Sequence, residues 1–422
     1  MQKETIAVHG GYNNKEGWGT MNVPIAQTTA YAFRDAEHAA NLFALKELGS
    51  IYTRLTNPTT DVLEQRFAQL EGGAAAICTA SGQAAIFYAI ANVAEAGDNV
   101  LISDKLYGGA VTLLTYTMKR FGINAKIFKS EDASNLEEQI DEKTKAIFFE
   151  SLSNPQIAIA DIEKIVEIAK RNGVLTVCDN TVASAALFNP IKWGVDVVVH
   201  STSKYTNGQG SAVGGIVVER DGLANFFKEN SQRYYHFTQP DPSYHGLVYT
   251  DVPLPNFCLR IRLNLLRDIG ATQSPYNSWL LLQTIETLDI RMEKHSKSAL
   301  EVAKFLESNP KVKAVNYPGL ESNPYYEKAQ KYFKDGKASG LISFEVEDYE
   351  TAKKVIDSAK LFSVVVNIGD SKSLIVHPAS TTHSQMNENE LKEAGINPTT
   401  IRLSIGLENP IDLIEDLEQA LS

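Results

Sequence analysis

The chain has few cysteines and no long hydrophobic run in its 422 residues. It contains three cysteines, which form no Cys-x-x-Cys pair and whose odd number fits a reducing compartment: Cys78, Cys178 and Cys258. No apolar stretch reaches 18 residues, and Met1-Gln2-Lys3-Glu4 lacks the hydrophobic region of a signal peptide. We therefore expect a soluble, cytoplasmic protein with no membrane partner.

The chain also has no excess of positive charge. The formal net charge is −11 at pH 7, with 40 Lys and Arg residues against 51 Asp and Glu residues. Proteins that bind nucleic acid or anionic membranes usually carry a basic surface, so we expect neither partner. The basic groups that matter for function should be individual residues in a pocket.

The two standard nucleotide-binding fingerprints are absent. No G-x-x-x-x-G-K-[ST] motif occurs in the chain. A glycine cluster precedes a predicted strand instead of joining a strand to a helix, and consists of Gly208, Gly210, Gly214 and Gly215. The sequence therefore disfavours ATP and NAD as ligands.

The order of the predicted elements indicates an α/β protein. Hydrophobic residues make up 43% of the chain, which is typical of a globular protein, and the length suggests about two to three domains. From residue 59 to about 252, strands alternate with helical stretches, which predicts a mostly parallel sheet with helices on both faces. The predicted strands are 75–78, 99–103, 125–128, 145–150, 174–179, 195–200 and 214–218.

The remaining segments surround this predicted domain. Residues 1–58 are rich in polar turns, which suits an extended arm. A proline-rich stretch, 239–255, predicts a long loop near the domain junction, and the acidic run 131–142 is interpreted as a solvated helix face. Apolar residues at helical spacing in 278–309 and strands at 311–317, 340–346 and 362–367 predict a smaller C-terminal α/β domain. The expected division is 1–58, 59–258 and 259–422.

A lysine follows a short apolar strand in the segment Ser201-Thr202-Ser203-Lys204-Tyr205. An ammonium group is costly to bury without a partner, and burial lowers its pKa toward the neutral amine that attacks a carbonyl. The neighbouring hydroxyls offer donors to an anion such as a phosphate. This combination suggests a Schiff-base lysine that holds pyridoxal phosphate. On this segment alone, a solvated lysine in a Ser/Thr-rich turn is the commoner explanation.

An aspartate ends the preceding predicted strand. Residues 174–178 are apolar enough to be buried on both faces, and Asp179-Asn180-Thr181 follows. Asp179 and Lys204 therefore end successive strands at the same edge of the sheet, where ligands of α/β proteins bind. A carboxylate there can keep the pyridine nitrogen of pyridoxal phosphate protonated. For Asp179 alone, a turn or capping role is the better explanation.

A third segment lies between a predicted strand and a helix. In Thr79-Ala80-Ser81-Gly82-Gln83, small residues join the strand 75–78 to the apolar stretch 84–93. Such a turn directs free backbone N–H groups and the helix dipole at a phosphate. Ser81 can equally be a plain N-cap of the helix.

Several ordered motifs, taken together, resemble the Cys/Met-metabolism family of pyridoxal-phosphate enzymes. They are residues 52–59 (YTRLTNPT), 81–85 (SGQAA), 179–181 (DNT), 201–205 (STSKY) and 401–408 (IRLSIGLE). Within that family the chain resembles the O-acetylhomoserine sulfhydrylase branch, through Gln83 and the segments 234–258, 265–271 and 369–385. The match runs from about His9 to about Pro410. The resemblance implies fold type I, with a large cofactor domain at 59–258 and a smaller C-terminal domain.

The resemblance also implies roles for individual residues around pyridoxal phosphate. Lys204 would form the Schiff base and move protons, Asp179 would pair with the pyridine nitrogen, and Tyr107 would stack on the ring. The implied contacts to the phosphate are Ser81, Gly82, Gln83, Ser201 and Ser203. Asn154 would lie near the phenolic oxygen and the substrate, and Arg402 and Ser373 would hold the substrate carboxylate. From the sequence alone, Tyr107 is more simply a core or turn tyrosine, and Asn154-Pro155 an ordinary turn.

Tyr52 and Arg54 imply a contact with a neighbouring subunit. In the family, the matching pair reaches the phosphate of the adjacent subunit, so the arm 1–58 would complete a shared active site. The resemblance therefore implies a homo-oligomer, expected to be a tetramer built from dimers.

The implied reaction is a γ-replacement. Sulfide, or methanethiol, would replace the acetyl group of O-acetyl-L-homoserine and give L-homocysteine, or L-methionine, plus acetate, in direct sulfhydrylation for methionine biosynthesis. Cystathionine γ-synthase or γ-lyase activity remains an alternative, and so do a succinyl ester and a different sulfur donor. A non-catalytic pyridoxal-phosphate binder is disfavoured, because it would not need the substrate clamp Arg402 beside Lys204.

Some positions depart from the family pattern. Gln209 stands where a histidine is usual, Ala26 replaces a common tyrosine, and residues 182–186 differ from the usual aromatic-and-proline run. These departures are expected to reshape the substrate or sulfur-donor side of the pocket. His377 and His383 lie six positions apart with Pro378 between them, which is no helical metal-ligand spacing, so we expect loop or packing roles and no metal.

Overall fold

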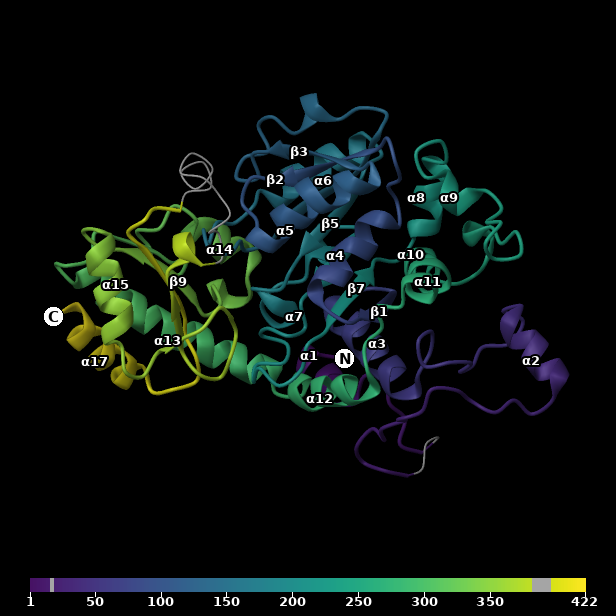
Figure 1. Ribbon diagram of the computed structural model, residues 1–422, viewed down its shortest axis with the longest axis horizontal. Coiled ribbons are helices and arrows are strands. Elements are labelled where there is room, and N and C mark those ends of the chain that lie inside the picture. Colours follow the sequence, from purple (N-terminus) through teal and green to yellow (C-terminus); the bar gives the residue numbers. More distant parts are fainter. Residues whose placement is uncertain (16–18, 382–395) are drawn as a thin grey trace.

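The computed structural model describes residues 1–15, 19–381 and 396–422. A large α/β domain lies in the centre of the molecule, a smaller α/β unit lies at the C-terminal end, and an N-terminal segment projects from the large domain (Figure 1). In these described residues, no helix combines the length and the apolar character that crossing a membrane requires.

The large domain is built on a seven-stranded sheet with the strand order β1-β7-β6-β5-β4-β2-β3. All its strands were predicted to within about two residues, and they are β1 (Ala75–Thr79), β2 (Asn99–Ser103), β3 (Asn124–Phe128), β4 (Thr144–Glu150), β5 (Leu175–Asp179), β6 (Val197–His200) and β7 (Gly215–Glu219). Only β7 runs antiparallel to its neighbours β6 and β1. The β6–β7 connection, residues 201–214, forms turns and contains no crossover helix, in keeping with this reversal. The predicted mostly parallel sheet is confirmed.

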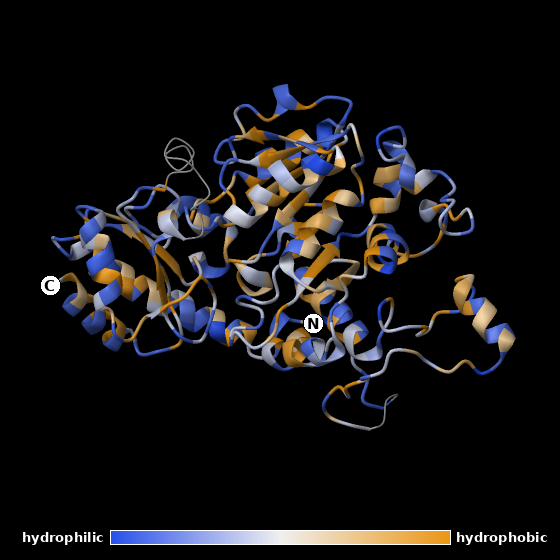
Figure 2. Ribbon diagram, viewed as in Figure 1, coloured by the Kyte–Doolittle hydropathy of each residue, from blue (hydrophilic) through white to orange (hydrophobic). Residues whose placement is uncertain are grey.

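Strands β2, β4, β6 and β7 are buried on both faces, which explains their largely apolar sequences, whereas the edge strand β3 is partly exposed. Neighbouring residues point to opposite faces, so that Phe149 and Cys178 join one apolar cluster and Phe148 and Val177 join the other. Figure 2 shows the hydrophobic strands enclosed by helices with hydrophilic outer faces.

Helices of the large domain cover the two faces of the sheet. On one face lie α3 (Pro58–Glu71), α6 (Ile162–Arg171), α7 (Ser184–Leu187) and α12 (Pro275–Ile285). On the other face lie α4 (Gly82–Ala91), α5 (Gly108–Thr112), α8 (Leu223–Glu229), α9 (Tyr235–Thr238) and α10 (Asn256–Arg260), and α11 (Arg267–Ile269) follows α10 in the chain. The apolar residues Ile162, Ile165 and Ile168 show the helical spacing that packs α6 on the sheet.

The smaller unit contains a five-stranded sheet with the order β10-β11-β12-β9-β8. Its elements are β8 (Ala314–Asn316), β9 (Leu341–Glu345), β10 (Ser363–Val364), β11 (Leu374–Val376), β12 (Thr400–Ser404), α13 (Leu288–Ser308), α14 (Tyr326–Tyr332), α15 (Tyr349–Ser358) and α17 (Pro410–Leu421). Strands β11 and β12 were not predicted as strands. In β12, Ile401 and Leu403 join the core of this unit, which turns Arg402 to the opposite face.

The N-terminal segment only partly matches the predicted arm. Its first residues form α1 (Lys3–His9), which packs on α3 through the buried Ala7, and Lys3 Nζ donates to the carbonyl of Ala185 at 2.6 Å. The first turn of the chain is therefore part of the large domain. The following residues, with α2 (Ala36–Phe43), extend away from the body of the molecule (Figure 1).

The sequence predicted a solvated helix for the acidic run 131–142, and this prediction is wrong. The run contains only the single 3₁₀ turn η3 (Glu137–Gln139). Its side chains bond to nearby backbone groups: Asp132 accepts from Ser134 N at 3.0 Å, and Asn135 accepts from Lys129 N at 2.8 Å. Such local bonds compete with helical bonds, which explains the turns.

The predicted domain boundaries stay a prediction. Helix α10 crosses residue 258, and Ile261 and Leu266 pack in the same apolar cluster as the large sheet. In α13, the first turns (Leu288, Met292) belong to the large-domain core, whereas Val302 belongs to the core of the smaller unit. We therefore propose that the change of domain lies within α13.

A buried polar cluster connects α3 to the end of β6. Glu71 and His200 are both fully buried, with Glu71 Oε1 2.5 Å from His200 Nε2. Glu71 also accepts from Asn180 Nδ2 at 3.0 Å and from Asn189 Nδ2 at 3.1 Å. These bonds hold the pKa of Glu71 below its usual value, although burial alone would raise it.

We expect Glu71→Ala to lower the free energy of unfolding by about 3–5 kcal/mol, because it leaves buried polar groups without an acceptor. The change is measured as a lower urea midpoint of tryptophan fluorescence. Replacing Glu137, whose ion pair with Arg171 is exposed, should leave the midpoint nearly unchanged. Equal midpoints for wild type and Glu71→Ala would contradict the structural role of this cluster.

Candidate functional site

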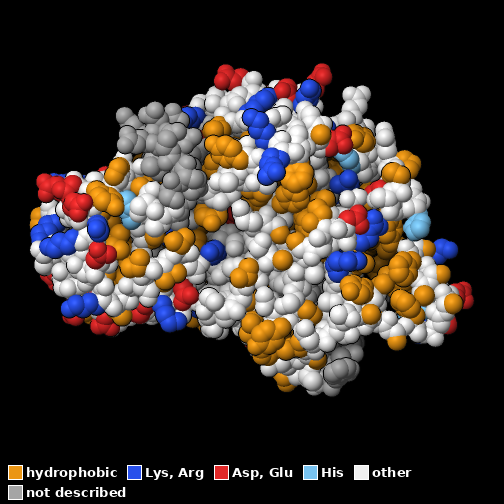
Figure 3. Space-filling view, viewed as in Figure 1, with side chains coloured by type: hydrophobic (Ala, Val, Ile, Leu, Met, Phe, Trp, Pro, Cys, Tyr) orange, Lys and Arg blue, Asp and Glu red, His pale blue; other side chains and the backbone are white. Residues whose placement is uncertain are grey.

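A cavity of about 350 Å³ opens where the carboxyl ends of β4, β5 and β6 face the smaller unit. It is lined from the large domain by residues such as Asp179 and Lys204, and from the smaller unit by Asn367 and Arg402. Figure 3 shows the surface hollowed between the two parts of the molecule. The cavity therefore lies at the sheet edge where the sequence placed a ligand.

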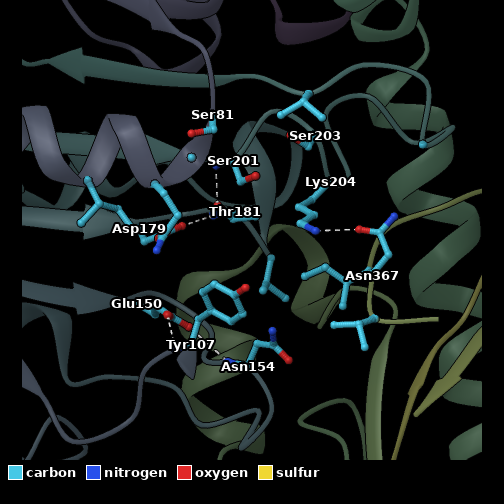
Figure 4. A pocket seen from close by; sticks show the side chains of 18 of the residues that line it. Ser81, Tyr107, Glu150, Asn154, Asp179, Thr181, Ser201, Ser203, Lys204 and Asn367 are labelled. Carbon is cyan, nitrogen blue, oxygen red and sulfur yellow. Dashed lines mark hydrogen bonds between the residues drawn. The ribbon is translucent and has the colours of Figure 1, made fainter. Parts of the chain in front are cut away.

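Lys204 lies in the turn that follows β6. The backbone N–H of Gly208 donates to the carbonyl of Lys204 at 2.8 Å, and Asn207 N donates to Thr202 O at 3.0 Å, which fixes the turn. The Lys204 ammonium donates to Asn367 Oδ1 at 2.6 Å, so its partner is a neutral amide (Figure 4). Burial and, secondarily, the charge of Arg402 lower the pKa of Lys204. The Lys204 ammonium therefore loses its proton more readily than that of an exposed lysine.

Asp179 ends β5, the strand beside β6. Its Oδ1 accepts the N–H of Thr181 at 2.8 Å. Burial raises the pKa of Asp179, and the hydrogen bonds from Thr181 oppose this shift. Asp179 and Lys204 line the same cavity, as expected for the ends of adjacent parallel strands.

The N-terminus of α4 forms another wall of the cavity. Ser81 is the N-cap, and its Oγ accepts the N–H of Ala84 at 3.1 Å. Gly82 approaches Ser201 so closely that an added Cβ would lie 2.5 Å from Ser201 Cβ. The first N–H groups of this helix, including that of Gln83, have no acceptor within the helix. Ser203, in contrast, uses its hydroxyl to accept from Gly214 N at 3.0 Å.

Tyr107 and Asn154 lie on the opposite side of the cavity from Lys204 (Figure 4). Both are held through their backbone N–H groups by the carboxylate of Glu150, at 2.6 Å for Tyr107 and 3.1 Å for Asn154. Asn154 Oδ1 in turn accepts from Arg402 Nη1 at 3.0 Å.

Arg402 is a buried cation whose hydrogen-bond partners, Asn154 and Asn367, are neutral. Its Nη2 donates to the carbonyl of Asn367 at 2.9 Å, while its Nε is buried and finds no acceptor among the described residues. Burial lowers the pKa of Arg402 to about 10, so the guanidinium stays charged at neutral pH. A buried charge with an unused donor fits a site that receives an anionic group.

The structure does not bring three of the predicted residues to the cavity. Ser373 is fully buried, and its Oγ donates to Glu408 at 2.9 Å and accepts from Gly406 N at 2.8 Å. Its hydroxyl therefore braces the chain after β12. Tyr52 and Arg54 lie on the projecting segment, where the Arg54 guanidinium stands 5.3 Å from the Tyr52 ring centre.

The sequence missed Glu150, Thr181 and Asn367, which all line the cavity. Glu150 had a signal, since it ends a predicted strand at the same edge as Asp179. Asn367 had a weaker one, as the polar residue that ends the apolar run 364–366. The predicted strand 362–367 ends earlier, at Val364, which leaves Asn367 free to turn into the cavity.

Of the positions that depart from the family pattern, only some line the cavity. Val182 lines the cavity, whereas Gln209 N bonds to Asn207 Oδ1 at 3.1 Å and Ala26 N to Thr59 Oγ1 at 2.9 Å. His377 bonds locally, to Ser380 Oγ and to Pro398 O, both at 2.8 Å. His383 lies outside the described residues, within which no group of His, Cys, Asp and Glu is suited to hold a metal ion.

The donor set of the cavity fits pyridoxal phosphate. Lys204 offers an amine for the aldehyde, Asp179 a carboxylate for the ring nitrogen, and the first turn of α4 offers N–H groups for the phosphate. The unused Nε of Arg402 remains for a substrate carboxylate. The aldehyde, the ring nitrogen and the phosphate of the cofactor therefore each find a chemically matched partner in the described residues.

Comparisons with known proteins agree with this site. Residues 4–422 match the family model described as Cys/Met metabolism PLP-dependent enzyme. O-acetyl-L-homoserine sulfhydrylase from Leptospira meyeri is 46% identical over 99% of this chain and 96% of its own length, and O-acetyl-L-homoserine sulfhydrylase 1 from Thermus thermophilus is 43% identical over 100% of both chains.

A solved structure is similar over the whole length as well. A crystal structure from Campylobacter jejuni, assigned as an O-acetylhomoserine (thiol)-lyase, is 56% identical over 100% of both chains, with a TM-score of 0.98. It contains an N′-pyridoxyl-lysine-5′-monophosphate residue. On the family match, the similarity over full length and the fitting donor set, the chain belongs to the Cys/Met metabolism family of enzymes that depend on pyridoxal phosphate.

Proposed function

We propose that the chain catalyses γ-replacement on O-acetyl-L-homoserine, in which sulfide replaces acetate and L-homocysteine is formed for methionine biosynthesis. The observation that carries this function is the half-buried Lys204 amine, which lines one cavity together with Asp179 and Arg402. The similar sulfhydrylases from Leptospira meyeri and Thermus thermophilus support the choice of ester and sulfur donor. Methanethiol, which would give L-methionine, is a second donor of the same chemical class.

Lys204 and Asp179 handle the protons of the reaction. Bound pyridoxal phosphate supplies an aldehyde that links to an amine and a ring that takes up negative charge from the substrate carbon. Lys204 bears the amine for this link, and its lowered pKa favours the neutral form that attacks and later accepts a proton. Asp179 holds a proton at the ring nitrogen, while Thr181 N keeps its carboxylate in place.

The other residues orient and bind. Arg402 holds the substrate carboxylate with the donors that the structure leaves unused, and Asn154 keeps the guanidinium in place. The phosphate is bound at the start of α4. The residues that surround it there are Ser81, Gly82, Gln83, Ser201 and Ser203. Tyr107 covers the ring. Such orientation contributes much of the rate in a site that must align two substrates.

A neighbouring subunit completes the site in this proposal. Tyr52 and Arg54 lie on the segment that extends from the large domain, where Tyr52 is 42% exposed and free to meet another chain. We propose that they contact the phosphate of the neighbouring subunit, in a tetramer built from dimers. The three cysteines are free and buried, in keeping with the proposed cytoplasmic location.

The purified protein with pyridoxal phosphate should form homocysteine and acetate from O-acetyl-L-homoserine and sulfide. Lys204→Ala should abolish this turnover and the visible absorption band of the bound cofactor, because the cavity then lacks the amine. Lys126→Ala is the matched control, since Lys126 pairs with Asp141 outside the cavity, and it should behave as wild type.

The same assay separates the alternative activities. Cysteine in place of sulfide would give cystathionine, omission of the thiol would give 2-oxobutanoate, and O-succinyl-L-homoserine tests the other ester. Homocysteine from the acetyl ester and sulfide should form fastest. A faster formation of cystathionine or 2-oxobutanoate would contradict the proposed reaction.

Arg402→Ala should act on the substrate more than on the cofactor. The loss of one charged hydrogen bond costs about 1.5–3 kcal/mol, and a bidentate pair costs more, so kcat/KM should fall at least about tenfold. Steady-state kinetics measure this loss, and the dissociation constant of the cofactor should change little. Weakened cofactor binding with an unchanged KM would place Arg402 at the cofactor.

Complementation tests the shared site. Inactive Arg54→Ala protein and inactive Lys204→Ala protein should regain activity when their subunits are exchanged, because a mixed dimer holds one site with both intact residues. Random pairing makes about half of the dimers mixed, so roughly a quarter of wild-type activity is expected. Mixtures that stay inactive after exchange would show that Arg54 serves its own chain.

A further inference from the structure

Glu150 joins two loops that carry proposed site residues. It is the last residue of β4, it is only 6% exposed, and it lies at the wall of the cavity. One carboxylate oxygen accepts the N–H of Tyr107 at 2.6 Å, and the other accepts the N–H of Asn154 at 3.1 Å (Figure 4). Tyr107 stands at the start of α5, on the loop after β2, and Asn154 lies on the loop after β4.

The bonds of Glu150 reach a third element through Asn154. With its backbone held by Glu150, Asn154 uses its side-chain oxygen to accept from Arg402, which belongs to β12 of the smaller unit. Glu150 therefore connects the residues proposed for the cofactor ring, the cofactor oxygen and the substrate carboxylate. No other described side chain accepts from both Tyr107 N and Asn154 N.

Burying an ionised carboxylate at this position costs free energy. Burial, and secondarily the charge of Asp179 opposite it in β5, raise the pKa of Glu150 well above its usual value. No ion pair to Glu150 occurs within the described residues. Two oxygens that both accept from backbone N–H groups are what a carboxylate offers and an amide does not, because an amide has one oxygen and one NH₂ group.

We propose that Glu150 is a positioning residue that sets the Tyr107 ring and the Asn154 amide against bound pyridoxal phosphate. The inference rests on the proposed function of the same cavity. Glu150 touches neither reacting atoms nor substrate in this role; it acts through the two loops. A carboxylate that only stabilised these loops would affect the stability of the protein but not the surroundings of the cofactor.

The test is Glu150→Gln in the holoenzyme. One oxygen becomes an NH₂ group that faces a backbone N–H, so Tyr107 or Asn154 loses its acceptor. The cofactor should still bind, because Lys204, Asp179 and the start of α4 are unchanged. Its visible circular dichroism, recorded without substrate, should lose intensity, the pH midpoint of its absorption change should shift, and kcat/KM should fall about tenfold or more.

Two further variants serve as control and second measurement. Asp104→Asn changes an acid to an amide in the same β2–α5 loop, where Asp104 accepts from Ser130 N at 3.1 Å, and it should leave the dichroism and the pH midpoint unchanged. Glu150→Asp keeps a carboxyl group with two oxygens on a shorter side chain, and should retain part of the dichroism that Glu150→Gln loses. It also provides the measurement if Glu150→Gln fails to fold.

Glu150→Gln or Glu150→Asp proteins with lowered stability but wild-type dichroism and pH midpoint would overturn the positioning role. The dichroism is recorded without substrate, so it tests Glu150 independently of the reaction. A wild-type protein that binds the cofactor but forms no homocysteine would count against the proposed function alone.

Discussion

The cost of burying charge at the carboxyl edge of the large sheet governs this structure. Strands that are buried on both faces end at this cavity, and four ionisable side chains line it: Glu150, Asp179, Lys204 and Arg402. Instead of pairing with one another, they are held by backbone N–H groups and by the amides of Asn154 and Asn367. Burial lowers the pKa of Lys204 toward the neutral amine that a cofactor aldehyde needs. The Nε of Arg402 has no partner among the described residues and is available to an anionic substrate.

The two parts of the molecule depend on each other at this edge. Arg291, in the first turns of α13, donates to the carbonyls of Tyr205 at 2.6 Å and Thr206 at 3.0 Å, just after Lys204. Gly369 meets Tyr205 so closely, and with a positive φ of 72°, that a side chain there would collide with the backbone. The start of α13 and Gly369 thus fix the turn of Lys204, and the smaller unit supplies Asn367 and Arg402 to the cavity. Neither part alone forms the site.

The sequence predicted what depends on local pattern. The apolar strands, together with the rule that parallel strands end at one edge of a sheet, predicted that Lys204 and Asp179 line the same site. Contacts between polar groups far apart in the chain follow no period, so Glu150, Asn367 and the bracing role of Ser373 did not emerge. Strand β11 was not predicted because it has only three residues, and β12 was not predicted because Arg402 interrupts its apolar pattern. In 131–142, side-chain bonds to the backbone outweighed helical propensity.

The measurement that tests the central claim most directly is the pKa of Lys204 in cofactor-free protein. Labelling with an amine reagent over a range of pH, followed by peptide mapping, gives the titration of Lys204 alongside that of the exposed lysines in the same samples. The structure predicts that Lys204 becomes reactive at lower pH than the exposed lysines, and that Arg402→Met moves its pKa part of the way back. A Lys204 that titrates with the exposed lysines, or that ignores the loss of Arg402, would contradict the claim that burial and a neighbouring cation prepare this amine.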